Sequence, residues 1–299
     1  MSTAAQRMPE IVDLQGQLEA VGYVAESSLA AALLLMVKLD RPLLVEGDAG
    51  VGKTEIAKSL AAVRGARLIR LQCYEGLDVH AAMYEWNYQR QLLAIKLLER
   101  DERPTAVKEQ DIFSERYLLK RPLLEAISCA EPPVLLIDEV DRADEAFEAY
   151  LLELLSDFQI SIPELGTVRA VTKPLVVITS NGTRELSDAL RRRCLYQYID
   201  YPTFEKELAI VEIRVPQAGA QLARQVVDFV QSVRRMDLQK RPGIAETLDW
   251  TAALLRMGIS TVDDDAAERI LETLSALIKT RDDRAGFTRE VVARIAAAC

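Results

Sequence analysis

The sequence predicts an α/β fold, with a parallel sheet covered by helices on both faces, followed by a smaller all-helical region. Several short segments are almost continuously apolar and are separated by amphipathic helical stretches, which is the pattern of a sheet buried on both sides. From Pro202 onward only helical periodicity remains in the sequence. We therefore expect an α/β core with N-terminal helices at residues 1–201 and a helical domain at residues 202–299.

Apolar periodicity gives the order of the elements along the chain. Apolar runs predict short buried strands at residues 42–46, 67–72, 134–138, 175–179 and 196–200. Helical periodicity in the core predicts helices at residues 11–21, 26–39, 54–63, 75–100, 121–129 and 142–158. Alternation around Pro163 and Gly166 predicts a β-hairpin over residues 160–171. The helical domain is expected to hold helices at residues 204–215, 218–236, 245–257, 264–279 and 289–298.

Composition narrows the classes of function. The formal net charge of -9 and the pI of about 5.0 give no general attraction to nucleic acid or to an anionic membrane. The apolar run at residues 29–37 is too short to span a bilayer, and the N-terminus lacks the plan of a signal peptide. The single histidine, His80, leaves little material for a catalytic triad or a histidine zinc site. Four scattered cysteines fit reduced thiols, so we expect a cytoplasmic protein without membrane insertion or a nucleic-acid partner.

A complete phosphate-binding loop stands between the first predicted strand and the helix after it. It reads Gly47, Asp48, Ala49, Gly50, Val51, Gly52, Lys53 and Thr54. Glycines let the backbone wrap closely around an anion, and the N–H groups at the start of the helix can cradle phosphates. Lys53 would reach the β- and γ-phosphates, and the Thr54 hydroxyl would bind Mg²⁺. The alternative is a glycine-rich turn with a chance lysine; the strand and helix on either side favour a site for a nucleoside triphosphate.

An acidic pair, Asp138 and Glu139, follows the buried strand at residues 134–138. A strand that ends beside the phosphate loop can place Asp138 to hold Mg²⁺, directly or through water. Glu139 is then suited to orient and deprotonate an attacking water. The alternative is that both carboxylates only cap the next helix. The complete phosphate loop upstream favours the catalytic interpretation.

Two further features complete the candidate site. Asn181 follows the strand at residues 175–179, and an adjacent strand would bring its amide near the γ-phosphate and the water; it also fits a plain turn. Three adjacent arginines at residues 191–193 cannot all form structural ion pairs on one helix face. One of them can therefore offer its guanidinium to phosphate, as an arginine finger does. The alternative is a solvated basic helix end.

These motifs together resemble the AAA+ ATPase superfamily. The glycine loop, the strand Leu-Leu-Ile-Asp-Glu, Asn181 and the text Leu-Arg-Arg-Arg-Cys carry that resemblance. Three segments resemble the MoxR branch of this superfamily. They are Asp-Glu-Val-Asp-Arg-Ala at residues 138–143, the predicted helical sequence Tyr-Leu-Leu-Glu-Leu-Leu at residues 150–155 and the predicted hairpin. Residues 72–78 and 84–88 resemble the CoxD-type subgroup, which is associated with maturation of molybdenum–copper enzymes.

The resemblance implies a P-loop AAA+ core with a helical lid, assembled as a ring, usually a hexamer. It implies that ATP lies between subunits and that an arginine finger acts on the neighbour's nucleotide. Comparison with the superfamily's Ser-Arg-Cys pattern makes Arg193 the first candidate for the finger and Arg192 the second. MoxR-type proteins usually have a Ser-Pro-Arg-like motif at the start of a lid helix. This sequence differs there, because residues 240–243 are Lys-Arg-Pro-Gly. Arg241 is the candidate for the lid arginine in this sequence.

The leading hypothesis for function is an ATP-driven chaperone that remodels a partner metalloenzyme or assists metal insertion. The resemblance implies a partner protein with a von Willebrand factor A domain, and the segments at residues 74–93 and 160–170 resemble the branch's two insertions. A ring helicase or loader is the alternative, but it predicts a basic, aromatic channel, and the hairpin carries only Arg169. A small-molecule kinase is a third hypothesis, which would need an acceptor pocket and no intersubunit arginine.

Overall fold

The computed structural model describes residues 8–98 and 104–299 of the chain. The chain divides into two compact units. The first, called the sheet unit, comprises Met1–Ile11, Ser27–Glu46 and Leu60–Tyr198. The second, called the helical unit, comprises Val12–Glu26, Gly47–Ser59 and Ile199–Cys299. The last segment of the helical unit begins close to the boundary predicted at residue 202, which itself stays a prediction.

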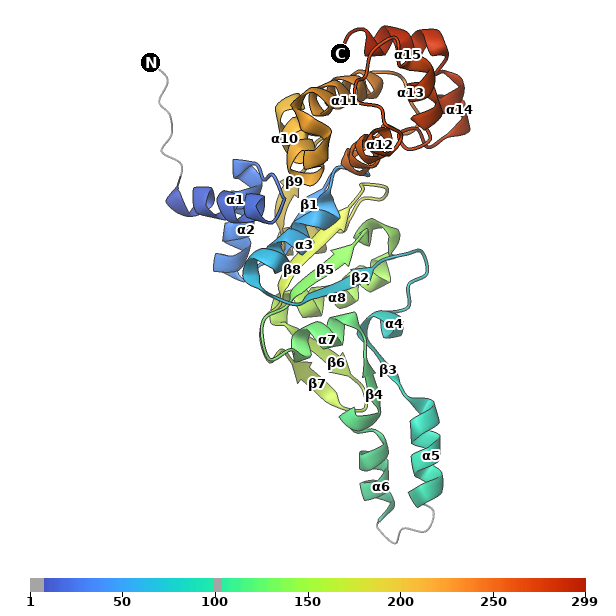
Figure 1. Cartoon of the computed structure of the whole chain (residues 1–299). Coiled ribbons are helices and arrows are strands. Elements are labelled where there is room, and N and C mark those ends of the chain that lie inside the picture. Colours follow the sequence, from blue (N-terminus) through green and yellow to red (C-terminus); the bar gives the residue numbers. More distant parts are fainter. Residues whose placement is uncertain (1–7, 99–103) are drawn as a thin grey trace. The chain divides into compact units, whose positions relative to one another are not determined.

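A five-stranded parallel sheet forms the centre of the sheet unit, in the order β2-β5-β8-β1-β9 (Figure 1). The strands are β1 (Leu43–Glu46), β2 (Leu68–Gln72), β5 (Val134–Asp138), β8 (Leu175–Ser180) and β9 (Leu195–Tyr198). Every residue of β5 is buried, as expected for a central strand of a covered parallel sheet. The predicted α/β fold with a parallel sheet and flanking helices is confirmed.

Flanking helices bury their apolar sides against this sheet. α2 (Ser27–Leu39) packs on β1 and β9, and α7 (Pro122–Ser128) packs on β2 and β5. α8 (Glu145–Asp157) packs on α9 (Asp188–Arg193) and is capped by Asp144, whose carboxylate accepts a hydrogen bond from the Phe147 N–H. Phe147, Leu151 and Leu154 are all completely buried, so the amphipathic pattern predicted for this segment is realised.

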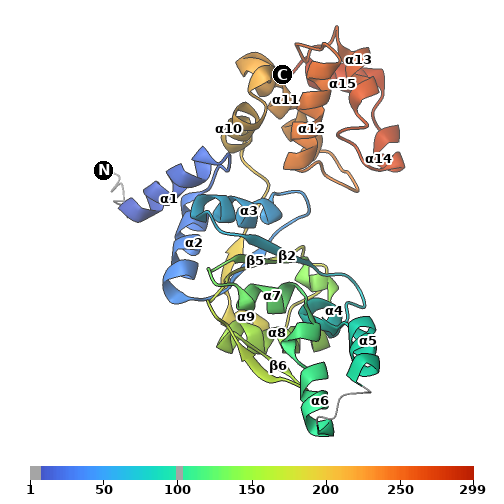
Figure 2. The ribbon, with the colours of Figure 1, turned by 60° about the horizontal axis from the view of Figure 1, so that its bottom comes forward.

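An insertion separates β2 from β5 and differs from its prediction. It contains α4 (Val79–Met83), β3 (Tyr84–Trp86), α5 (Tyr88–Leu98), α6 (Thr105–Ile112), a 3₁₀ turn (Glu115–Tyr117) and β4 (Leu118–Lys120). The prediction of a mainly helical segment over residues 75–100 is wrong at β3, which pairs antiparallel with β4. That pairing joins residues more than thirty positions apart, which local periodicity does not register. Figures 1 and 2 both show α5 and α6 side by side beyond this short ribbon.

The predicted β-hairpin is confirmed as β6 (Gln159–Ile162) paired antiparallel with β7 (Gly166–Arg169). Its turn holds Pro163, Glu164 and Leu165. Ile160 and Ile162 are buried in the core of the sheet unit, whereas Ser161 between them is exposed. The hairpin is therefore anchored by one face and presents its turn to the surface.

The helical unit contains α1 (Pro9–Ala20) for most of its length, the start of α3 (Lys53–Arg64) and all the helices after residue 199. The latter are α10 (Phe204–Arg214), α11 (Gly219–Arg234), α12 (Ile244–Arg256), α13 (Ala267–Thr273), α14 (Arg281–Ala285) and α15 (Arg289–Ala296). The rings of Phe229 and Trp250 lie 4.9 Å apart in its core, and the Trp250 indole N–H donates to the Thr273 hydroxyl at 2.8 Å. As predicted, the described residues after Pro202 form no strand.

Element ends differ from prediction where sequence signals are weak. The helix predicted at residues 264–279 shortens to α13, and α6, β4 and α14 were not predicted. His80 lies within α4, and its side chain lies outside the described part of the chain. Among the helices that the structure describes, none combines the length and the apolar character needed to cross a membrane.

Candidate functional site

The phosphate loop adopts a conformation that depends on glycine. Gly50 and Gly52 have φ values of 84° and 92°, which side-chain-bearing residues rarely adopt. Lys53 is 6% exposed, and its ammonium donates to the carbonyl oxygens of Gly47 at 2.6 Å and Asp48 at 2.7 Å. α3 begins at Lys53, so the loop leads directly into a helix N-terminus. The predicted strand, loop and helix sequence is present.

Within the helical unit, the start of α12 packs directly on this loop. The Ile244 N–H donates to the Gly50 carbonyl oxygen at 2.9 Å. A Cβ at Gly243 would lie 2.6 Å from both the Gly50 Cα and its carbonyl oxygen. Gly243 is also the N-cap of α12, and its N–H donates to the Glu246 carboxylate at 3.0 Å. A glycine at residue 243 is therefore required for this close approach.

Tyr201 lies in the helical unit, among charged groups that shift the pKa of its phenol. Burial raises the pKa of its phenol, the negative charge of Asp48 raises it further, and the charges of Arg234 and Arg241 lower it. The Arg234 guanidinium lies 5.2 Å from the centre of the Tyr201 ring. Arg241 itself is exposed. The charges of Asp48 and Arg241 thus act on the pKa of the same phenol in opposite directions, which the sequence did not indicate.

In the sheet unit, Asp138 ends β5 and is 3% exposed. Its Oδ1 accepts a hydrogen bond from the Thr179 hydroxyl at 2.6 Å, and its Oδ2 accepts from the Arg70 guanidinium, with the Nε at 3.1 Å. Arg70 comes from β2, whose register pairs Gln72 with Asp138. The carboxylate is therefore oriented by groups from both neighbouring strands.

Glu139 has a left-handed backbone conformation, with φ of 55° and ψ of 50°. Its N–H donates to the Thr179 hydroxyl at 2.9 Å. Its Oε1 accepts from the Asn181 amide at 3.3 Å, and its Oε2 accepts from the Gln72 amide at 3.2 Å. The Arg142 guanidinium lies 2.8 Å from the same Oε2. The structure thus brings together Glu139 and Asn181, as the sequence analysis expected.

Asp141 fixes the turn that carries Asn181. Its carboxylate accepts from the N–H of Asn181 at 3.1 Å, the N–H of Thr183 at 3.0 Å and the Thr183 hydroxyl at 2.6 Å. Burial acts to raise the pKa of this carboxyl group, but the hydrogen bonds outweigh it and hold the pKa below its ordinary value. Asp141 therefore stays ionised and keeps Asn181 beside Glu139.

The three arginines of α9 differ in their surroundings. The Arg191 guanidinium lies 3.4 Å from the Glu46 carboxylate. Arg193 is exposed and donates to the Ser156 hydroxyl at 2.5 Å and to the Ala189 carbonyl at 3.0 Å. Arg192 is exposed, and its side chain makes no hydrogen bond or ion pair within residues 8–98 and 104–299. The expectation that the three cannot all be paired agrees with this arrangement.

Sequence reasoning missed several residues that hold the site. They are Arg70, Gln72, Asp141, Arg142, Thr179 and Tyr201. For Arg70 and Gln72 a signal existed, because two polar residues at alternate positions of an otherwise apolar strand lie on one face. Cys73 follows them; burial and the nearby carboxylates of Asp138, Asp141 and Glu139 raise its pKa to about 12, so it remains a neutral thiol.

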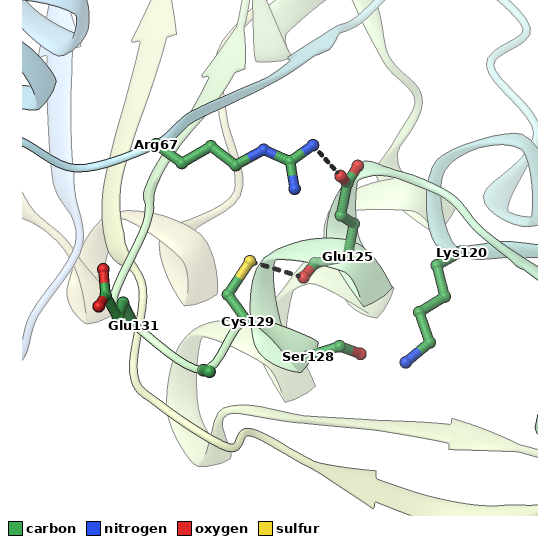
Figure 3. A pocket seen from close by; sticks show the side chains of 7 residues that line it. Arg67, Lys120, Glu125, Ser128, Cys129 and Glu131 are labelled. Atoms are coloured by element: carbon green, nitrogen blue, oxygen red, sulfur yellow. Dashed lines mark hydrogen bonds and ion pairs between the residues drawn. The ribbon is translucent and has the colours of Figure 1, made fainter.

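A separate pocket lies at the opposite edge of the sheet, near the starts of β2 and β5 (Figure 3). Arg67 and Glu125 form an ion pair across it, and the Cys129 thiol donates to the Glu125 carbonyl at 3.3 Å. Because Asp138 and Ser180 lie at the carboxyl ends of their strands, this pocket is not part of the candidate site.

Comparison with known proteins gives a family match over residues 42–194, to the AAA domain (dynein-related subfamily). Gas vesicle ATPase GvpN2 of Halobacterium salinarum is 24% identical over 257 residues, which are 82% of this chain and 70% of the relative. Gas vesicle ATPase GvpN of Haloferax mediterranei is 26% identical over 236 residues, which are 75% of this chain and 63% of the relative.

Among solved structures, a RuvB mutant from Thermotoga maritima aligns with a TM-score of 0.49 and 18% identity. The alignment covers 91% of this chain and 76% of the RuvB chain. The predicted family is confirmed by the domain match, which extends over half of the sequence and includes the phosphate loop, the acidic pair and the arginines. The chain belongs to the AAA domain family, and it is an AAA+ ATPase that uses ATP with Mg²⁺.

Proposed function

We propose that this ATPase is a molecular chaperone that acts as a ring and remodels a partner protein, with a metalloenzyme as its client. The observation that carries the proposal is the surface of the insertion between β2 and β5. On α5, Tyr88, Leu92, Leu93 and Leu97 are 64%, 60%, 60% and 73% exposed. Exposed apolar side chains gathered on one helix are typical of a surface that contacts other proteins.

The residues of the phosphate loop fit a nucleoside triphosphate. Gly47, Asp48, Ala49, Gly50, Val51, Gly52, Lys53 and Thr54 supply backbone N–H groups, one ammonium and one hydroxyl in the order that the loop requires. Lys53 would exchange the carbonyls of Gly47 and Asp48 for phosphate oxygens. Arg241 would contact the nucleotide from the lid, which the shared influence of Asp48 and Arg241 on Tyr201 supports.

Thr54 and Asp138 would hold Mg²⁺, because a hydroxyl and a carboxylate are oxygen ligands of the kind this cation prefers. When bound, Mg²⁺ neutralises charge on the phosphates. Asp138 is suited to the role because it is buried and its two oxygens are oriented by Thr179 and Arg70. Displacing the Arg70 guanidinium would free one oxygen for the metal or for a water bound to it.

Glu139 would act as the general base on the attacking water, with Asn181 orienting it. The amide of Asn181 lies 3.3 Å from Glu139 Oε1, so both groups can contact one water at this position. Gln72 and Arg142 hold the other oxygen of Glu139. One carboxylate oxygen is therefore positioned for chemistry while the other is anchored.

A ring is proposed because α9 offers guanidinium groups at its surface. Arg193 would act as the finger on a neighbouring copy, with Arg192 as the second candidate. Arg193 would have to leave Ser156 to do so, whereas Arg192 needs to leave no partner among the described residues. Further parts of the proposal rest on the family resemblance: a hexamer, a von Willebrand factor A domain partner, a CoxD-like role in metal insertion and a cytoplasmic location.

The alternative of a nucleic-acid loader is less well supported. The hairpin β6–β7 and its turn carry Arg169 as the one basic residue and contain no aromatic residue. A surface that binds single-stranded nucleic acid combines several basic groups with aromatic rings on which bases stack. This hairpin has one basic residue and no aromatic ring.

An ATP-dependent capture tests the proposed function. Glu139→Gln should bind ATP and hydrolyse it slowly, so that a client stays bound when the protein is expressed in its native host. Lys53→Ala, which should not bind ATP, is the matched control. A metalloenzyme recovered with ATP from Glu139→Gln alone would support the proposal. Nuclease-sensitive DNA or RNA in that sample, without a protein client, would contradict it.

A further inference from the structure

A second pocket of the sheet unit has a chemistry that ATP hydrolysis does not use. It encloses about 460 Å³ between the insertion and the turn of the β6–β7 hairpin. Its lining combines three aromatic and three acidic side chains: Asp78, Tyr84, Glu85, Trp86, Tyr88 and Glu164. These residues come from segments about eighty positions apart, which the fold brings to one cavity.

The aromatic side of the pocket is formed by closely packed rings. Tyr84 and Trp86 are 5% and 6% exposed, and their rings lie edge to face with centres 6.4 Å apart. Phe113 packs edge to face on Trp86 from α6, with ring centres 5.5 Å apart. Tyr88, at the start of α5, is 64% exposed and forms the outer aromatic member. Aromatic faces attract cations through the ring quadrupole.

The acidic side is only partly neutralised. Glu85 forms an ion pair with Arg121, whereas Glu164 forms no hydrogen bond or ion pair with any residue that the structure describes. Burial raises the pKa of the Tyr84 phenol, and the negative charge of Glu164 raises it further. Glu164 therefore projects negative potential onto the aromatic wall, which favours a positively charged occupant.

Trp86 provides a third, independent sign of a ligand. Its indole N–H is buried and finds no acceptor within the described part of the chain. A buried N–H without an acceptor is unfavourable, and an indole N–H can only donate. Because the indole nitrogen is covered, a ligand reaches it only by displacing neighbouring side chains; one that then brings a carbonyl oxygen together with a positive charge would satisfy both the indole and Glu164.

We propose that this pocket binds an arginine or lysine side chain presented by a protein segment. A peptide supplies both requirements, a cationic side chain for the acids and rings and a backbone carbonyl for the Trp86 indole. Tyr88 and Leu92 are one helical turn apart on α5, so the exposed apolar surface continues directly from the pocket. The segment recognised would therefore carry a basic residue next to apolar residues.

Other occupants fit the lining less well. An anion would meet the three carboxylates. Among the described residues, no three His, Cys, Asp or Glu side chains form a group able to hold a metal ion. A free polyamine would satisfy the carboxylates and rings but carries no carbonyl for the indole. The proposed site goes beyond the ATPase function, and its occupancy is measured without nucleotide, so it stands or fails separately from the chaperone proposal.

Calorimetric titration of the full chain tests the site with defined probes. The first pair of probes is Nα-acetyl-arginine amide and its neutral analogue Nα-acetyl-citrulline amide. The second pair compares spermidine with a peptide in which an arginine is followed by two leucines. The arginine probe should bind at least about 10-fold more tightly than the citrulline probe, because the charge contributes both ion pairing and cation–π attraction. The leucine-containing peptide should bind more tightly than the arginine amide.

Variants assign the binding to this pocket. Glu164→Gln should weaken the arginine probe by roughly 3- to 10-fold, and Tyr88→Ser by a similar factor, whereas Tyr88→Phe keeps the ring and should bind as the unmodified chain does. Glu109→Gln, an exposed glutamate of α6 outside the pocket, is the matched control and should change nothing. ATP turnover should be unaffected by all four substitutions.

Three results would overturn the inference. Equal affinity for the arginine and citrulline probes would exclude recognition of the charge. Equal effects of Glu164→Gln and Glu109→Gln would place any binding elsewhere. Tighter binding of spermidine than of the leucine-containing peptide would make the pocket a site for a small polycation rather than for a protein segment.

Discussion

At the residue scale, the acidic pair is held by side chains from strands on either side. Thr179 on β8 contacts Asp138, and its hydroxyl also accepts from the Glu139 N–H. Arg70 and Gln72 on β2 contact Asp138 and Glu139 respectively. Each acid therefore has a polar partner on β2, and a metal or a water that binds the acid would compete with that partner.

The Arg70–Asp138 pair leads to a prediction about the metal requirement. Arg70→Gln should lower the Mg²⁺ concentration that gives half-maximal ATP turnover, since the guanidinium competes with the metal for Asp138 Oδ2. The Arg70 side chain is 49% exposed, so the pair is worth only about 0.5–1 kcal/mol, and the shift should be roughly 2- to 5-fold. Turnover is measured across a Mg²⁺ titration at fixed ATP.

Arg67→Gln is the control for this titration. Arg67 immediately precedes β2, and its guanidinium pairs with Glu125 at the other edge of the sheet. Its substitution should leave the Mg²⁺ requirement unchanged. A higher Mg²⁺ requirement in Arg70→Gln would show that Arg70 assists metal binding instead of competing with it.

The candidate residues that the sequence revealed are those whose chemistry is local. The phosphate loop is one contiguous octet, and the acidic pair directly follows an apolar strand. Arg70 and Gln72 lie 68 and 67 positions before the acids they contact, and only the parallel register of β2 and β5 brings them together. Sheet register is set by packing, which a single sequence does not display.

At the element scale, the contact between α12 and the phosphate loop depends on the absence of side chains. The Gly50 and Gly243 backbones approach so closely that a Cβ at residue 243 would lie 2.6 Å from backbone atoms of Gly50. Gly243, the last residue of the segment Lys-Arg-Pro-Gly, is the N-cap of α12, so this helix begins directly against the loop.

Gly243→Ala should consequently destabilise the chain. The added methyl must push α12 away from the loop and break the hydrogen bond from Ile244 to Gly50, which is 2.9 Å long. Overpacking of this kind costs about 1–3 kcal/mol, which corresponds to a fall in melting temperature of roughly 2–10 °C. Thermal unfolding followed by circular dichroism measures the change.

Gly16→Ala is the matched comparison in the same unit. Gly16 lies within α1, and a Cβ there would meet nothing within 4 Å. This substitution should be neutral or stabilise the chain by about 0.5–1 kcal/mol, since alanine is the better helix former. Equal melting temperatures for Gly243→Ala and the unmodified chain would contradict the close contact.

Elements were predicted well where apolar periodicity is continuous and poorly where pairing is distant. β1, β5 and β8 are buried apolar runs that the sequence displays directly, whereas β2 alternates between covered and exposed residues and β9 is only half-buried. The sequence pattern predicts a helix at β3, because the partner strand β4 follows only after α5 and α6 and local periodicity does not register it. The tertiary pairing, together with the burial of Tyr84 and Trp86, overrides the local helical pattern.

At the scale of the whole molecule, the proposal requires that copies of the chain complete one another's sites. In this proposal, Lys53 and Glu139 would act on the nucleotide of their own copy, whereas Arg193 would act on that of the neighbour. Exposed arginines at the end of α9 are compatible with this division. ATP turnover per chain should therefore depend on assembly.

Mixing two inactive variants tests this claim most directly. Lys53→Ala lacks ATP binding but keeps the finger, and Arg193→Ala lacks the finger but keeps the rest of its own site. In an equimolar mixture, about a quarter of the sites should combine an intact nucleotide site with an intact finger, and ATP turnover should rise well above that of either variant alone. A mixture of Lys53→Ala with Glu139→Gln repairs no site and should stay inactive. If the Lys53→Ala and Arg193→Ala mixture is no more active than its components, or if Arg193→Ala alone is fully active, the account of hydrolysis between copies with Arg193 as the finger is contradicted.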